Sequence, residues 1–165
     1  MHSRKTVLWF LICGCILTLN GCGGSSNAGN STSQPANQSN ENANVPKTNQ
    51  EELSLLINVP FETEDIEWKD DATKKEITAV LLFSSADANK TVADAEKIRP
   101  AEDVTTRVQS WFPQELIAQS EMGGGEDEVR GKAYAADQFY QEPYTTGRII
   151  RVENTDYFIV ELSAK

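Results

Sequence analysis

The side chains that most often carry out covalent or metal chemistry lie near the start of this 165-residue chain. The single histidine is His2, and the three cysteines are Cys13, Cys15 and Cys22. Residues 51–165 contain no histidine and no thiol, which excludes Ser-His-Asp and Cys-His catalysis and the usual zinc and copper sites from that part. The chemistry left to it is that of carboxylates, of a Ser/Lys pair, or of a hard cation bound by oxygen.

Two short runs concentrate carboxylates. In the run ETEDIE, residues 62–67, Glu62, Glu64 and Asp65 lie close together, and a glycosidase needs two carboxylates about 5–10 Å apart. The run GGGEDE, residues 123–128, places carboxylates beside a glycine loop. It lacks the alternating Asp spacing of known calcium loops, which favours a solvated acidic hinge. We therefore assign no catalytic residue, no metal site and no cofactor.

Aromatic residues are densest in the stretch YAADQFYQEPY. Tyr134, Phe139, Tyr140 and Tyr144 lie there next to a predicted loop, and aromatic side chains near loops bind peptides or sugars. The alternative is that they pack in or around the core, as most aromatics of a small domain do. We expect any binding surface of the domain to lie at these four residues.

The charge of the chain limits its partners. Residues 51–165 hold 24 acidic and 12 basic side chains, a formal net charge of −12. Phosphate recognition needs clustered Lys and Arg, so we expect no nucleic-acid partner. The acidity is typical of a soluble domain.

The first residues have the pattern of an export signal. A basic start at residues 1–5 precedes the uncharged, largely apolar run 6–19, and Leu19, Asn20, Gly21 and Cys22 follow at its end. As a helix this run would span about 21 Å, which is short of the roughly 30 Å core of a bilayer. The pattern therefore favours a cleaved signal over a transmembrane helix.

The motif Leu19-Asn20-Gly21-Cys22 resembles the lipobox of bacterial lipoprotein signal peptides. The resemblance covers residues 1–24 and implies that Leu19, Gly21 and Cys22 are recognised, that the Cys22 thiol receives a diacylglycerol group, and that cleavage before Cys22 is followed by acylation of the new amino terminus. It also implies a location on the outer side of the cytoplasmic membrane or, since Gly23 follows the cysteine, in the outer membrane facing the periplasm. An ordinary secretory signal with an incidental cysteine is the alternative.

We expect three segments. The resemblance implies a signal peptide at residues 1–21 and a lipidated cysteine at the start of residues 22–50. The rest of the second segment is a tether rich in Asn, Ser and Gly, which cannot bury enough apolar surface to fold. A coil of this length, about 28 residues, has an end-to-end distance of roughly 30 Å. Residues 51–165 form one globular domain.

Apolar periodicity places the elements of this domain. Alternating apolar residues predict strands at 53–59, 66–68, 76–85, 129–135, 148–152 and 156–162, the last two as a hairpin with its turn at 153–155. Helices are predicted at 91–98 and 102–111, and a further one begins at Pro113 and ends at Glu121. Strand 76–85 carries apolar residues on both faces and should lie inside the sheet.

The expected fold class is α+β, a single small domain with a largely antiparallel sheet of about four to six strands and two or three short helices between the N-terminal and C-terminal strands. The sequence favours a lipid-anchored cell-envelope protein whose acidic domain binds or scaffolds an envelope protein or glycan. The alternative is a small carboxylate-dependent hydrolase that acts on envelope glycans. A cleft with two buried carboxylates would favour the hydrolase.

Overall fold

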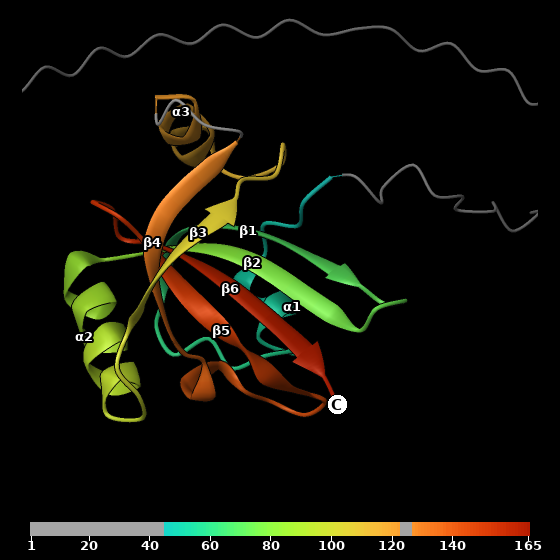
Figure 1. Cartoon of the computed structure of the whole chain (residues 1–165). Coiled ribbons are helices and arrows are strands. Elements are labelled where there is room, and N and C mark those ends of the chain that lie inside the picture. The colour runs from blue at the N-terminus through green and yellow to red at the C-terminus, as the bar shows by residue number, and fades with distance from the viewer. Residues whose placement is uncertain (1–44, 123–126) are drawn as a thin grey trace, which may run out of the picture. The chain divides into compact units, whose positions relative to one another are not determined.

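Six antiparallel strands form one open sheet in the order β1-β2-β6-β5-β4-β3 (Figure 1). The computed structural model describes Val45–Met122 and Asp127–Lys165. The strands are β1 Thr63–Asp71, β2 Glu76–Phe83, β3 Glu102–Arg107, β4 Glu128–Ala135, β5 Tyr144–Val152 and β6 Tyr157–Ala164. The helices are α1 Gln50–Leu53, α2 Ser85–Glu96, α3 Gln114–Met122 and the short 3-10 helix η2 Asp137–Phe139. The described part is thus a single small domain with three α-helices, in which the sheet dominates.

The interior strands β2 and β6 bury both of their faces. Ile77, Leu81 and Phe83 of β2 join one core cluster, whereas Val80 joins a second cluster on the opposite side. Alternate residues of β6 divide in the same way, as the two-residue period of a strand requires. The prediction of an interior strand here is therefore confirmed, although the strand ends at Phe83 and not at Ser85. The predicted hairpin of β5 and β6 is confirmed as well.

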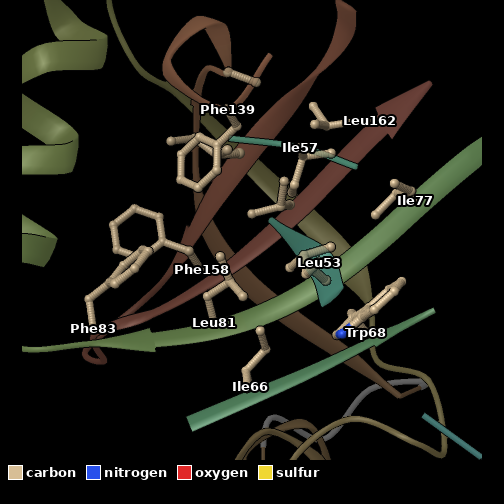
Figure 2. Close-up of a cluster of buried hydrophobic side chains, with 14 of the residues drawn as sticks. Leu53, Ile57, Ile66, Trp68, Ile77, Leu81, Phe83, Phe139, Phe158 and Leu162 are labelled. Carbon is tan, nitrogen blue, oxygen red and sulfur yellow. The ribbon is translucent and has the colours of Figure 1, made fainter. Parts of the chain in front are cut away.

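Helices cover the two faces of the sheet. We call face A the side whose core cluster includes residues of α1, α2 and η2, and face B the side whose cluster includes α3. Figure 2 shows the face A cluster, in which Leu53 and Ile57 of the N-terminal segment pack among side chains of β1, β2 and β6. Pro113 immediately precedes α3, as its fixed φ favours.

The helix predicted at 102–111 is wrong, because β3 occupies Glu102–Arg107. Val104, Val108 and Trp111 are spaced for one face of a helix, but Val104, Thr106 and Val108 also alternate as a strand requires. β-branched residues favour the strand. The apolar side chains at 104, 108 and 111 still pack on face B.

The strand predicted at 53–59 is also wrong. Asn49 caps α1, its side chain accepting a hydrogen bond from the Glu52 amide at 3.0 Å, and this cap favours a helical start. Leu53 and Ile57, four residues apart, are fully buried, whereas Leu55 is 75% exposed. The helix predicted at 91–98 is wrong in its bounds, because Ser84 caps α2 and accepts from the Asp87 amide, so that the helix begins at Ser85.

Contacts with the sheet begin before residue 51. Lys47 and Trp68 exchange two backbone hydrogen bonds of 2.8 and 2.9 Å across the outer edge of β1. The Trp68 indole donates to the Asn49 carbonyl oxygen at 3.2 Å, and the Gln50 amide oxygen accepts from the Thr63 amide and hydroxyl at 3.0 and 2.8 Å. The segment from Lys47 onward is thus part of the domain.

The predicted signal peptide, the lipidation site at Cys22 and residues 22–44 of the expected tether lie outside the described residues, as do residues 123–126 of the GGGEDE run. Within the described ranges, no helix is long and apolar enough to span a bilayer.

Candidate binding groove

An open groove of about 790 Å³ lies at the β3 end of the sheet. Its lining comes from β3, from β4, from the end of β5 and from the turn that leads into β6. We call it the Tyr134 groove, after the one aromatic side chain among its lining residues. None of its lining residues belongs to α1, α2 or η2.

Cationic side chains gather in this groove. Arg130 and Lys132 lie two residues apart on β4 and therefore on one face of the sheet. Lys132 is directly opposite Arg151 of β5 in the strand register. Like charges opposite each other in a sheet repel, so this arrangement requires anionic groups nearby.

The carboxylates of Asp103, Glu153 and Asp156 supply that negative charge. Asp103 of β3 lies 3.1 Å from Lys132 Nζ, and Asp156 lies 2.5 Å from Arg151 Nη2. The Asp103 side chain is 88% exposed, so water screens this pair strongly. The Ser85 hydroxyl, which donates to Asp156, and the Arg151 guanidinium together hold the pKa of Asp156 below its usual value.

The ion pair of Arg130 is looser. Its Nε lies 3.6 Å from the Glu153 carboxylate, and the Arg130 side chain is 82% exposed. Two donors of Arg151, in contrast, are engaged by neutral groups, since Nε donates to the Thr155 carbonyl oxygen and Nη1 to the Asn89 side chain of α2. Arg151 is therefore held by three partners, whereas Arg130 and Lys132 are exposed and each has an ion pair with one carboxylate.

Tyr134 supplies the aromatic part of the groove. Its side chain is 4% exposed and packs in the face A cluster, and it also belongs to the lining of the groove. Burial, followed by the negative charge of Glu96, raises the pKa of the Tyr134 phenol. The phenol therefore stays protonated at neutral pH and able to donate a hydrogen bond.

The other three aromatic residues of the expected surface lie elsewhere. Phe139 is fully buried in the face A cluster, where Figure 2 shows it near Ile57 and Phe158. Tyr140 is half-buried, and its hydroxyl donates to the Gly147 carbonyl oxygen at 3.3 Å. Tyr134 is opposite Ile149 in the register, and Tyr144 begins β5 five residues earlier, about 16 Å away along the strand. Of the four, only Tyr134 lines the groove.

A second group of ionisable side chains lies on face B near α3. Tyr157 of β6 donates a hydrogen bond to Asp65 of β1 at 3.4 Å, and its pKa is raised to about 12 by burial and by the nearby charges of Glu115 and Asp65. Glu67 is half-buried, and its Oε2 has no hydrogen-bond partner among the described residues. Burial, then the charges of Asp65 and Glu115, raises its pKa.

This acidic group is the feature most like a pair of catalytic carboxylates. A protonated carboxyl beside an ionised one is the arrangement that glycosidases use. However, neither the Tyr134 groove nor either of two smaller cavities, one beside Trp68 and one beside Arg148, is lined by Glu67, Asp65 or Glu115. Glu62 and Glu64 of the ETEDIE run are exposed. Within the described ranges, no three ligand-type side chains are placed to hold a metal ion.

The cationic residues of the groove were not predicted from the sequence. Their signal was present, because Arg130, Lys132 and Tyr134 alternate within the strand predicted at 129–135 and must share one face. Arg151 became part of the same site only through the pairing of β4 with β5. Comparison with protein-family models, with curated proteins and with solved structures gave no significant match to this chain.

Proposed function

We propose that this protein is a non-catalytic binding module of the bacterial cell envelope, held at a membrane by lipid on Cys22. The lipobox-like motif that ends at Cys22 supports the anchor. A single acyl chain binds a membrane only marginally, at about 0.8 kcal/mol per buried CH₂, and two or three chains make the binding stable. The polar segment between Cys22 and Lys47 then separates the folded domain from the lipid surface.

The Tyr134 groove is the observation that carries the binding role. It gathers Arg130, Lys132 and Arg151 in a domain where acidic side chains outnumber basic ones two to one. A partner that brings carboxylate or phosphate groups would compete with Glu153 and Asp103 for Arg130 and Lys132, whose side chains are 82% and 59% exposed. An acidic envelope glycan or an acidic segment of an envelope protein has this chemistry.

Site-specific photo-crosslinking in intact cells tests the proposal. A photoreactive residue at Glu153, an exposed position in the groove, should form an adduct with an envelope component. The matched position is Glu64 on β1, which is also exposed but lies at the other edge of the sheet. Lys132→Glu should weaken the adduct at Glu153, because it reverses one of the groove's cations.

Equal adducts at Glu153 and Glu64, or an adduct that Lys132→Glu leaves unchanged, would contradict binding in the groove. The mass of the adduct distinguishes a glycan from a protein and either of these from a second copy of this chain.

A carboxylate-dependent hydrolase is the second candidate, because Glu67 is half-buried beside Asp65 and Glu115. Turnover of envelope glycans that Glu67→Gln abolishes, while the exposed control Glu64→Gln leaves it intact, would replace the binding module by this enzyme. We expect no such turnover, since Glu67 lines none of the cavities described above.

A further inference from the structure

The two edge strands of the sheet differ in whether another segment pairs with their outer side. At β1 the outer edge is bridged by Lys47, which pairs with Trp68. At the other end, β3 pairs with β4 over all six of its residues, and no other described segment pairs with its outer side. An unpaired strand edge offers backbone donors and acceptors to another strand.

The residues of β3 are complementary to a second copy of β3. In an antiparallel pair, directly opposite residues lie on the same face of the sheet. A two-fold axis that is perpendicular to the sheet and relates the two β3 strands must therefore lie level with one residue, which is then opposite its own copy. With the axis at Thr105, Asp103 of each copy lies opposite Arg107 of the other, on face A. On face B, Val104 then lies opposite Thr106.

Neighbouring registers lack this match. With the axis at Val104, Asp103 lies opposite Thr105 and Glu102 opposite Thr106, so no charge is paired. Opposite charges directly across an antiparallel pair stabilise it and like charges destabilise it. The side chains of Asp103, Thr105 and Arg107 are all exposed in the single chain. The Asp103 carboxylate pairs with Lys132 of its own chain but is 88% exposed, which leaves room for a second cation beside it.

We propose that the protein forms a homodimer through the outer edge of β3, with the two-fold axis at Thr105 and two reciprocal Asp103–Arg107 ion pairs. The six-stranded sheets of the two copies then continue into one another. Because Asp103 and Thr105 also line the Tyr134 groove, the two grooves adjoin across the axis. The interface is a single pair of short strands, so the dimer is weak in solution and is favoured by the high local concentration of a membrane-bound protein.

Disulfide trapping in the membrane tests the register. The starting point, called the background chain, is the full chain with Cys13→Ser and Cys15→Ser. Its only remaining cysteine is Cys22, so any reducible dimer that it forms shows that some Cys22 is unmodified. Thr105→Cys should add a reducible dimer on mild oxidation, because opposed Cβ atoms lie about 4.5–5.5 Å apart, close to the roughly 3.5–4.5 Å of a disulfide. Asp103→Cys is the matched control, since the substituted positions of the two copies would be about 13 Å apart along the strands.

We expect at least about tenfold more dimer from Thr105→Cys than from Asp103→Cys. Absence of the Thr105→Cys dimer, or equal yields from both variants, would overturn the proposal. Both yields are compared after subtraction of any dimer that the background chain forms through Cys22.

Charge exchange gives a second test that does not depend on cysteine chemistry. Each single variant, Asp103→Arg or Arg107→Asp, places like charges opposite each other at both ion pairs of the dimer. The affinity of the dimer, measured by sedimentation of the detergent-extracted protein, should therefore fall about tenfold or more. The double variant restores opposite charges and should recover the dimer. The exposed Lys74→Asp, in the turn between β1 and β2, makes the same charge change as Arg107→Asp and should have no effect.

Loss of the dimer in the double variant as well, with thermal melting showing that it is folded, would overturn the proposed pairing.

Discussion

Removing residues 45–50 should destabilise the domain strongly, although these residues are polar and precede the predicted boundary at Glu51. The experiment compares three chains that all end at Lys165 and that begin at Gly23, Val45 and Glu51. The last of them lacks the residues that pair with β1 and cap α1. Because these residues cover the outer edge of β1, their removal also uncovers Trp68, which is fully buried in the intact domain.

The size of the effect is set by the hydrogen bonds of the removed residues. At least nine bonds disappear: two between Lys47 and Trp68, one from the Trp68 indole, three of the Gln50 side chain, the Asn49 cap, and two from the Leu53 and Ser54 amides to the carbonyl oxygens of residues 49 and 50. A typical bond contributes about 0.5–1.5 kcal/mol net, and exposed bonds contribute least, so the free energy of unfolding should fall by about 4–6 kcal/mol. That is a large part of the roughly 5–15 kcal/mol of a typical domain.

Calorimetry or circular dichroism at pH 7 measures this decrease. For a domain of this size about 1 kcal/mol corresponds to roughly 3–5 °C in Tm, so the chain that begins at Glu51 should melt more than about 10 °C below the chain that begins at Val45. The chains that begin at Gly23 and Val45 should melt within about 2 °C of each other. Gln50→Ala should reproduce part of the decrease, and the exposed neighbour Glu51→Ala should not.

A chain that begins at Glu51 and melts with the longer chains would refute this reasoning. It would mean that the hydrogen bonds of Lys47, Asn49 and Gln50 add nothing beyond what water supplies to the same groups.

Three further variants test the packing and the ionisable groups. Gly147→Ala should lower Tm by about 10 °C or more, because Gly147 has a φ of 144° and an added Cβ would overlap the Glu161 carbonyl oxygen and lie 2.9 Å from Leu162 Cα; an unchanged Tm would contradict the close approach of β5 to β6. Glu67→Gln should raise Tm at pH 7, since folding raises the Glu67 pKa and thus disfavours its ionised form, and the gain should vanish below the ordinary value of 4.5. Asp156→Asn should lower Tm at pH 7, since folding lowers the Asp156 pKa, and its effect should shrink as the pH falls below 3.8. Parallel pH profiles of the last two variants, measured by thermal melting, would contradict the opposite pKa shifts.

The sequence predicted the interior of the sheet well and its ends poorly. Strands β2 and β6 carry apolar side chains at almost every position, and only an interior strand with both faces covered can bury them all. The β5–β6 hairpin was equally clear, because Asn154 and its polar neighbours separate two apolar runs, and Asn154 adopts the positive φ of 60° that such a turn favours.

The predictions near the two edges of the sheet were wrong because the same apolar residues fit both the period of a helix and the period of a strand. Val104, Val108 and Trp111 have helical spacing, yet the strand that contains Val104 is fixed by its pairing with β4. At the other end, Leu53, Leu55 and Ile57 alternate as in a strand, yet the Asn49 cap begins a helix that leaves Leu55 in solvent. Tertiary pairing and capping overrode a weak local pattern in both places.

The groove was only partly accessible to sequence reasoning. Tyr134 was singled out for its aromatic neighbours, but those neighbours lie in the core or at the far end of β5. What places Tyr134 in the groove is the pairing of β4 with β3 and β5, which brings Asp103 and Arg151 beside Lys132. Pairing between strands distant in sequence is a property of the fold, and no local pattern encodes it.

The intact mass of the protein extracted from membranes tests whether this domain is held at the envelope by lipid on Cys22. We expect a chain that begins at Cys22, with a mass increased by a diacylglycerol group on sulfur and an acyl group on the amino terminus. Cys22→Ser should leave the domain folded and either block processing or release the protein into the soluble fraction. A mature chain with an unmodified Cys22, or one that begins at another residue, would contradict the account and leave a secreted domain without a lipid anchor.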